Sequence, residues 1–143
     1  METLNNATVE LLQQRFGHDC LIALATLDGD WPAVRTVNAL YMDRAFYVVT
    51  NALSGKMQQI TQNERVAVSG EWFTGRGRGE NLGHIQAPQN AALAQQLRTA
   101  FAAWYDNGHV NEQDPHTCIL KIRMERGTLL SHGNCYEIDF RTE

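Results

Sequence analysis

The chain has 143 residues, which fits one domain, since domains commonly run to about 100–200 residues. Hydrophobic residues make up 43% and charged residues 20%, a composition typical of a globular protein rather than a disordered one. Twelve Lys and Arg against sixteen Asp and Glu give a net charge of −4. Nucleic acid is therefore not expected as the main partner, because counterion release requires clustered positive charge.

The targeting signals and the cysteine pattern of the sequence favour a cytoplasmic protein. No apolar run approaches the roughly 18 residues that span a membrane, and Met1 to Phe16 lack the basic end and apolar stretch of a signal peptide. The cysteines are odd in number and form no CxxC pair; they are Cys20, Cys118 and Cys135. That pattern favours reduced thiols over a disulfide framework. We predict one cytoplasmic domain, residues 1–143, that partners neither membrane nor nucleic acid.

The N-terminal part of the chain predicts a helix and then three strands. Mixed apolar spacing over Thr3–Phe16 favours an amphipathic helix, capped by Asn6 or Thr8 and ended by Gly17. Asp-Gly between apolar runs predicts a hairpin at residues 28–30, and residues 43–44 form a second short turn. The predicted strands are Cys20–Leu27, Trp31–Met42 and Ala45–Thr50.

Alternation along the second predicted strand sorts its side chains into two faces. One face carries Trp31, Ala33, Arg35, Val37, Ala39 and Tyr41. The other carries Val34, Thr36, Asn38 and Leu40. The side chains of the candidate site residues on this strand, discussed below, therefore point to both of its faces.

After Thr50 the hydrophobic period changes from that of a strand to that of a helix. A short helix is predicted over Ser54–Asn63, then a strand over Arg65–Phe73, a loop over Thr74–Gly79 and a strand over Glu80–Ala87. Pro88 suits the first turn of a further helix, whose apolar stripe is Leu93, Leu97, Phe101 and Trp104.

The polar stretch Asp106–His116 ends that helix, and Thr117–Leu130 and Tyr136–Phe140 supply the last strands. The whole chain then reads as mainly β, an antiparallel meander of six or seven strands decorated by about three helices. Short hairpins without regular βαβ alternation favour a closed or nearly closed barrel.

One segment has the features of an anion site. Ser54 is a good helix N-cap residue, and the helix that follows presents free N–H groups and the positive end of its dipole. Lys56 in the first turn is unfavourable for the helix alone, and an arriving phosphate would reverse that balance. Thr50 adds a hydroxyl, and Arg35 on a neighbouring strand could reach the same place.

The segment is not a P-loop, because Met57 follows Lys56 and Thr50 stands where the first glycine would be. The plain alternative is that Lys56 is solvated, Ser54 only caps the helix, and Arg35 pairs with an acid. Spacing alone leaves both interpretations open.

Around this segment the sequence resembles the pyridoxamine 5′-phosphate oxidase-like split barrels that bind FMN. The matching elements are a strand ending in Thr50, Ser54-Gly55-Lys56, a helix, and Asn63-Glu-Arg65-Val66. Upstream, Leu24 to Gly29 and Pro32 to Val37 resemble the first hairpin of that family. The resemblance implies an antiparallel split β-barrel with FMN as cofactor.

Carried over by position, the resemblance implies roles for nine residues in FMN binding. Four border the ring system and ribityl chain from the second strand: Arg35, Thr36, Val37 and Asn38. Two lie at the end of the third strand, Thr50 and Asn51, and three hold the phosphate, Ser54, Gly55 and Lys56. No catalytic residue and no metal ligand is assigned.

The family pairs two barrels around each flavin, so the resemblance implies a homodimer with the flavin at the interface. The small size of the chain favours the same assembly, because one barrel offers little wall to enclose FMN. Trp72 or Trp104 could belong to the partner's side of the pocket, although packing in the core or the dimer is the plain interpretation for each.

The resemblance leaves the reaction open. The tail from Cys135 to Glu143 has one Arg and no Arg-x-His pattern, which counts against vitamin B6 oxidation. The main hypothesis is an FMN-dependent oxidoreductase that passes hydride or electrons between NAD(P)H and a small acceptor. The alternatives are a non-catalytic flavin-binding or redox-sensing module, and a haem-binding split barrel.

Two weaker patterns are noted. The loosely spaced His109, His116 and Cys118, with His132 and Cys135, could hold a soft metal or haem, but ordinary surface histidines are the simpler interpretation. Arg76-Gly-Arg78-Gly is interpreted as a mobile hairpin tip; a functional version would place both arginines over an acidic group of a substrate.

Overall fold

A computed structural model describes residues 2–141. Its strands are β1 (Glu2–Thr3), β2 (Cys20–Asp28), β3 (Trp31–Met42), β4 (Ala45–Asn51), β5 (Arg65–Gly70), β6 (Phe73–His84), β7 (Thr117–Ser131) and β8 (Asn134–Asp139). Its helices are α1 (Asn6–Phe16), α2 (Gly55–Gln62) and α3 (Ala91–Ala100), with short helical turns η1 (Pro88–Asn90) and η2 (Tyr105–His109).

Six strands close into an antiparallel barrel. The order β7-β4-β3-β2-β5-β6 returns to its start because β6 also pairs with β7. Strand β8 extends β7 outside the ring, and β1 pairs with β8 in parallel. The predicted mainly β barrel with its helical decoration is confirmed, and its closure leaves few free strand edges.

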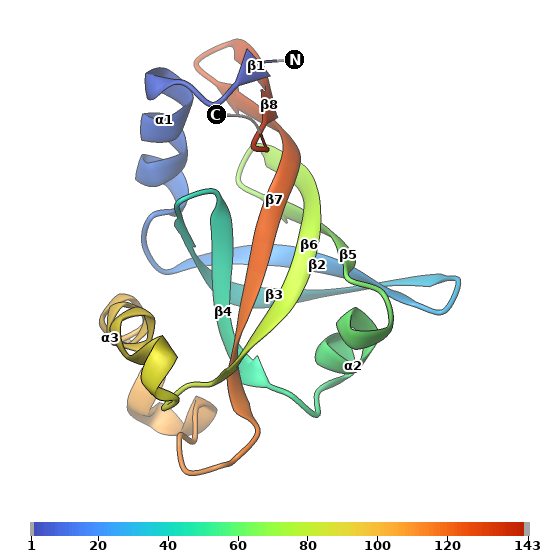
Figure 1. Cartoon of the computed structure of the whole chain (residues 1–143). Helices are drawn as coiled ribbons and strands as arrows, with labels where there is room; N and C mark the ends of the chain where they lie inside the picture. Colours follow the sequence, from blue (N-terminus) through green and yellow to red (C-terminus); the bar gives the residue numbers. More distant parts are fainter. Residues whose placement is uncertain (1, 142–143) are drawn as a thin grey trace.

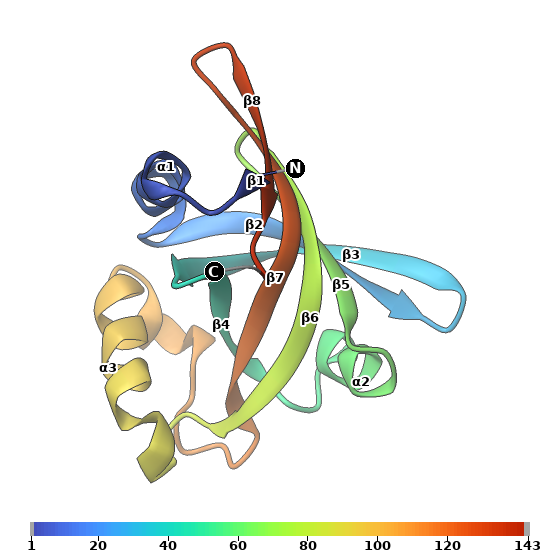
Figure 2. The ribbon, with the colours of Figure 1, turned by 45° about the horizontal axis from the view of Figure 1, so that its top comes forward.

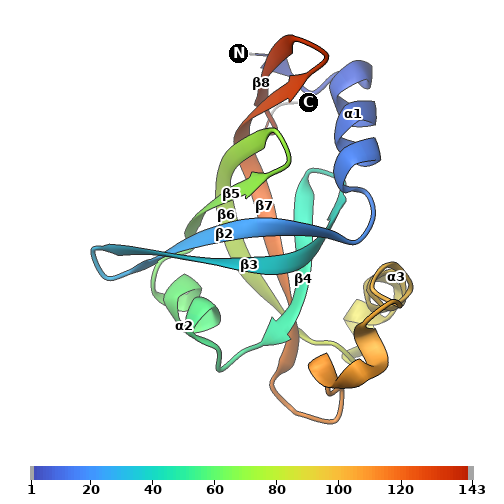
Figure 3. The same cartoon turned by 180° about the vertical axis from the view of Figure 1, so that it is seen from behind.

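The connectivity is two meanders rather than one. Strands β2-β3-β4 form the first and β5-β6-β7-β8 the second, and α2 carries the chain between them. The tip of the β2–β3 hairpin projects beyond the barrel on the side of α2, while α3 lies on the opposite side (Figures 1 and 3). The projecting hairpin leaves Trp31 and Val34 exposed, at 79% and 69% of their surface.

Helix α1 starts at Asn6, inside the predicted range Thr3–Phe16, and its cap lies one residue before the nearer of the two predicted caps. Its N-cap is Asn5, whose side chain accepts a hydrogen bond from the backbone N–H of Thr8, while the Thr8 hydroxyl accepts from the backbone N–H of Asn5. This reciprocal arrangement satisfies two N–H groups at once, so Asn6 is left inside the helix. Gly17 ends the helix as predicted.

The predicted loop over Thr74–Gly79 is wrong, because this segment lies within the long strand β6. Its alternating glycines face the barrel interior. A Cβ on Gly75 would lie 2.6 Å from the Met124 side chain, and one on Gly79 would lie 3.0 Å from Ile60. The arginines between the glycines point outward, so Arg76 and Arg78 are not at a mobile hairpin tip. The real β5–β6 turn is at residues 71–72, next to Phe73.

The barrel interior is filled by aromatic rings in contact. Phe16 from α1 packs against Phe46 and Phe73, with ring centroids 5.6 Å apart in both pairs, and Phe140 packs edge-on against Phe73. A second core, under α3, includes Leu97, Phe101 and Ile119. Figure 2 shows α1 and α3 against the barrel wall, and no described helix is long and apolar enough to cross a membrane.

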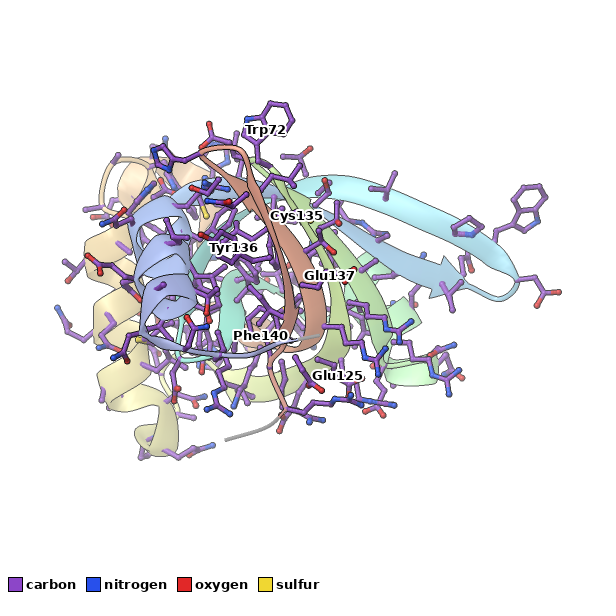
Figure 4. All side chains as sticks on the ribbon, turned by 90° about the horizontal axis from the view of Figure 1, so that it is seen from above. Trp72, Glu125, Cys135, Tyr136, Glu137 and Phe140 are labelled. Carbon is purple, nitrogen blue, oxygen red and sulfur yellow. The ribbon has the colours of Figure 1, made fainter. Side chains whose placement is uncertain are left out.

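Trp72, by contrast, lies at the β5–β6 turn with 69% of its surface exposed. Figure 4 shows its side chain pointing away from the barrel, and Phe140 pointing toward the interior. The described chain therefore does not use Trp72 in its core.

Candidate functional site

The barrel wall opens between β3 and β4. The two strands pair only from Leu40 to Met42 with Ala45 to Tyr47. Beyond that point the rest of β3 stays paired with β2, and the rest of β4 stays paired with β7. The facing edges of β3 and β4 thus carry backbone groups that no described strand satisfies, and such groups are ready donors and acceptors for a ligand.

A pocket of about 400 Å³ lies at this opening. That volume falls within the range of about 300–1,000 Å³ usual for small-molecule sites. Its lining residues are Val37, Asn38, Val48, Val49, Thr50, Lys56, Trp104, His109 and Val110. Four of the nine sequence-predicted residues are among them: Val37, Asn38, Thr50 and Lys56. The pocket also contains Trp104 of the same chain.

Arg35 lies beside this pocket in a network of neutral groups. Its Nη1 donates to Thr26 Oγ1 at 2.8 Å and to the Leu24 carbonyl at 3.2 Å, and its Nη2 donates to Gln59 Oε1 at 3.0 Å. Thr26 and Gln59 are also joined to each other at 2.5 Å. The guanidinium is therefore fixed in orientation by β2 and α2, but its charge is not neutralised by these partners.

Arg35 and Lys56 form an uncompensated pair of cations. Within residues 2–141 neither takes part in a salt bridge. Burial lowers the pKa of Lys56, and the nearby positive charge of Arg35 lowers it further. Burial also lowers the pKa of Arg35. The alternative in which Arg35 pairs with an acid is not what the structure has, and an anion would relieve the repulsion of both groups.

Ser54 occupies the N-cap position of α2, yet its side chain makes no capping hydrogen bond. Its hydroxyl oxygen is buried and has no partner among the described residues. A buried polar group without a partner is costly, so this hydroxyl is suited to a ligand atom. Gly55 follows it, and a Cβ there would meet nothing nearer than the Gln59 side chain at 3.8 Å, which leaves room for a ligand at the helix N-terminus.

The remaining predicted residues have other positions. The Asn51 side chain accepts from the backbone N–H of Leu53 and donates to Asp114 Oδ2 at 3.1 Å, so it shapes the turn before α2. Thr36 lies on the opposite face of β3 from Arg35 and is exposed. The structure thus brings together Arg35, Val37, Asn38, Thr50, Ser54, Gly55 and Lys56 around the opening and the start of α2.

Asp19 is a site residue that sequence reasoning missed. Its carboxylate accepts from Asn38 Nδ2 at 2.9 Å and from Trp104 Nε1 at 2.8 Å. It thereby links two lining residues that come from β3 and from the segment after α3. Asp19 lies in the turn before β2, and no spacing in the sequence relates it to Trp104.

Trp104 is held from both sides. Its ring centroid lies 4.9 Å from that of Phe101 and 6.3 Å from that of His109. The segment that carries His109 is anchored by Glu112, which accepts from Arg98 Nε at 2.8 Å and from the Tyr105 hydroxyl at 2.7 Å. Arg98 and Tyr105 hold the pKa of Glu112 at about 2. The side of the pocket formed by η2 is therefore a fixed wall.

The histidines and cysteines are not gathered. Within residues 2–141 no group of three or more His, Cys, Asp and Glu side chains is arranged to hold a metal ion. His84 contacts the Asp114 carbonyl through Nε2 at 2.9 Å, and His116 Nδ1 lies 3.3 Å from the Asp114 carboxylate. These contacts stabilise the loop before β7, while His109 lines the pocket.

No protein-family model matches the sequence, and no curated protein matches it significantly. Solved structures of the same fold do match. A putative pyridoxamine 5′-phosphate oxidase from Listeria innocua superimposes with a TM-score of 0.65 at 16% identity, covering 87% of this chain and 96% of that one. The chain has the split-barrel fold. At such low identity the likeness defines the fold alone.

Two further solved structures are named for different cofactors, one for FAD and one for haem. A FAD-binding protein from Mesorhizobium loti has a TM-score of 0.66 at 18% identity and covers 88% of this chain and 94% of its own. A haem-binding protein from Mycobacterium smegmatis has a TM-score of 0.63 at 15% identity and covers 85% of this chain and 53% of its own. The split barrel therefore occurs with both kinds of planar cofactor.

Proposed function

We propose that the chain binds FMN in the opening between β3 and β4 and works as a flavin-dependent oxidoreductase. The observation that carries this proposal is the uncompensated pair Arg35 and Lys56, next to the partnerless buried hydroxyl of Ser54. A phosphate group supplies two negative charges and several acceptor oxygens, which is what these groups lack. The phosphate end of FMN would be held here.

The rest of the pocket suits the ring system of the flavin. Val37, Val48 and Val49 offer apolar surface, and Trp104 offers an aromatic wall that Asp19 fixes in place. Free backbone groups along the β3 and β4 edges can orient the polar edge of the ring. Bound flavin would supply hydride or electron transfer, and these residues would bind it, orient it and exclude water.

The proposed electron donor is NAD(P)H and the proposed acceptor a small molecule. The pocket is open to one side, so the acceptor can approach the ring system there. Vitamin B6 oxidation is not proposed, because the described tail carries Arg141 alone, paired with Asp139 at 3.0 Å. That arginine is already neutralised and is not available to a second phosphate.

We also propose that the active form is a homodimer with the flavin at the interface. The support is the exposed apolar surface of the projecting hairpin, Trp31 and Val34, together with Leu53 beside the start of α2, which is 60% exposed. Large exposed apolar patches commonly mark protein–protein interaction sites. Light scattering should give twice the chain mass, and Trp31→Ser should lower it toward the monomer; a monomer that binds FMN fully would contradict this part.

The direct test is a titration of the purified protein with FMN and, in parallel, with riboflavin. We expect quenching of FMN fluorescence on binding and much weaker binding of riboflavin, because riboflavin lacks the phosphate. Lys56→Ala should lower the affinity for FMN by roughly tenfold or more and change that for riboflavin little. Equal binding of the two flavins, or none of either, would contradict the proposal.

The titration also separates the alternative functions. FMN binding without oxidation of NAD(P)H by any tested acceptor would support a flavin-binding or redox-sensing module. A haem site has one observation in its favour, namely His109 in the pocket lining, since histidine is a common ligand of haem iron. A Soret shift on haem addition that His109→Ala removes would favour haem over FMN.

A further inference from the structure

Five arginines lie on the outer face of three neighbouring strands. Across the sheet, Arg65 of β5 is directly opposite Arg78 of β6, and Arg78 is opposite Arg123 of β7. One level along, Arg76 is opposite Arg126. These five are a large share of the twelve basic residues in a chain of net charge −4. We refer to Arg65, Arg76, Arg78, Arg123 and Arg126 as the arginine face.

This arrangement opposes the stability of the sheet. Like charges directly opposite each other on neighbouring strands are destabilising, and three such pairs occur here on two neighbouring levels of the sheet. Where a sequence keeps a feature that costs stability, function is the usual reason. The register of β5, β6 and β7 therefore points to a ligand that needs several positive charges at once.

Only part of this charge is neutralised within the described residues. Arg78 donates to Glu64 at 2.7 Å and to Glu125 at 2.9 Å. Arg65 and Arg76 form no salt bridge in the described part of the chain. Arg126 has a buried Nε with no hydrogen-bond partner there, while Asp139 of β8 is directly opposite it on the other side.

A groove of about 540 Å³ runs along this face. Arg65, Arg76 and Arg78 are among its lining residues, together with Glu125, which is labelled in Figure 4. The rest of the lining is largely small or apolar: Ala25, Thr26, Leu27, Pro32, Val66, Ala67 and Gly77. The groove and the β3–β4 opening share no lining residue, although Thr26 of the groove accepts a hydrogen bond from Arg35 beside the opening, so the groove is a second concavity next to the first.

We propose that this groove binds a phosphate monoester carried on a planar heterocycle, the chemistry of a nucleoside monophosphate. A phosphate monoester carries a charge near −2 at neutral pH, which matches the two unpaired guanidinium groups of Arg65 and Arg76. The apolar strip of Leu27, Pro32 and Ala67 accepts the flat ring. The proposal does not rest on flavin binding at the β3–β4 opening.

The test is calorimetric titration with adenosine 5′-monophosphate and, as the matched uncharged probe, adenosine. Wild-type protein should bind the monophosphate and bind adenosine much more weakly. Arg76→Gln should weaken monophosphate binding by roughly tenfold, because it removes a charge-assisted contact. Arg15→Gln, which removes an arginine on α1 outside the groove, should leave the affinity unchanged.

The melting temperature gives a second test, because Arg76→Gln should not lower it although the same substitution weakens binding. Since Arg76 faces Arg126, Arg76→Gln should leave the melting temperature unchanged or raise it, even as binding falls. A purely structural role for Arg76 would lower the melting temperature, and that result would overturn the proposal.

Three other outcomes would also overturn it. One is equal binding of monophosphate and adenosine. Another is monophosphate binding that Lys56→Ala abolishes and Arg76→Gln does not, which would place the ligand in the β3–β4 opening instead. The third is a change of oligomeric state in Arg76→Gln by light scattering, which would assign the arginine face to contact with a second copy of the chain.

Discussion

The indole Nε1 of Trp104 donates a hydrogen bond of 2.8 Å to the carboxylate of Asp19, a residue 85 positions earlier in the chain. The same carboxylate accepts from Asn38. One acid in the turn before β2 therefore sets the position of two groups that line the opening between β3 and β4, and it does so without itself lining the pocket.

Asp19→Ala should release Trp104 and weaken FMN binding several-fold. Removing the carboxylate loses two hydrogen bonds to a charged group, each worth about 1.5–3 kcal/mol in general. The readout is the fluorescence of Trp104 in a Trp31→Phe, Trp72→Phe background, where it is the sole tryptophan of the three. We expect a red shift in Asp19→Ala; Asp106→Asn on the exposed side of η2 is the control. Unchanged emission would show that the ring stacking alone positions Trp104.

Ser54→Ala should have opposite effects on stability and on binding. In the free protein the hydroxyl is buried without a partner, so its removal should leave the melting temperature unchanged or raise it. With FMN present the variant loses a donor to the phosphate, and the stabilisation that FMN confers should be smaller than in wild type. Thermal melts with and without FMN measure both quantities. A lower melting temperature without FMN would indicate that Ser54 acts only as a helix cap.

Glu112 should make stability depend on pH in the acid range. Its pKa is about 2 in the folded chain, below the ordinary value of 4.5, because Arg98 and Tyr105 donate to it. The stability it contributes is therefore fully present above about pH 4.5 and is lost as the pH falls toward 2. Urea unfolding at pH 6 and at pH 3 should show a smaller drop for Glu112→Gln than for wild type. Equal drops would mean that the contact with Arg98 also persists in the unfolded chain.

Gly77→Ala should destabilise the barrel by about 1–3 kcal/mol, the usual cost of overpacking a core. A Cβ at Gly77 would lie 2.1 Å from the Arg123 carbonyl oxygen, which is backbone and cannot move aside cheaply. Gly55→Ala is the matched control for stability, since its Cβ would meet nothing within 3.8 Å. Denaturant melts would compare them. The β6–β7 register shifts between Arg76 and Gly77, and no loss of stability in Gly77→Ala would imply that β6 bends away from β7 at this point.

The strands with clear alternation were predictable from the sequence, and so were the turns that carry glycine. Strands β2 and β3 begin and end within a residue of their predicted limits because Asp28-Gly29 fixes the hairpin between them. Helix α2 was also predictable, since the period changes after β4. The candidate anion site was predictable from that helix start, because Ser54 and Lys56 follow the end of β4 within five residues.

Two features were not predictable from the sequence, each for a physical reason. Residues 74–79 of β6 have the composition of a loop because the inward positions are glycines, and the space that side chains would fill there is already occupied by Met124 and Ile60. The signal that remained was a period of two, with glycine alternating with polar residues. The partnership of Asp19 with Trp104 left no local signal at all, since it depends on how α3 packs against the barrel.

The short pairing of β3 with β4 also determines where the barrel exchanges its amide hydrogens with water. The ladders between β6 and β7 and between β4 and β7 are long, whereas β3 with β4 and β2 with β5 each pair over three residues only. Beyond Leu40 and Tyr47 one edge of β3 and one edge of β4 have no described strand beside them. Outward-facing amides on these edges exchange without any unfolding, whereas those shared between β6 and β7 need the barrel to open. The flank of the pocket should thus be among the readily deuterated stretches of the sheet, and a ligand seated there would complete the wall.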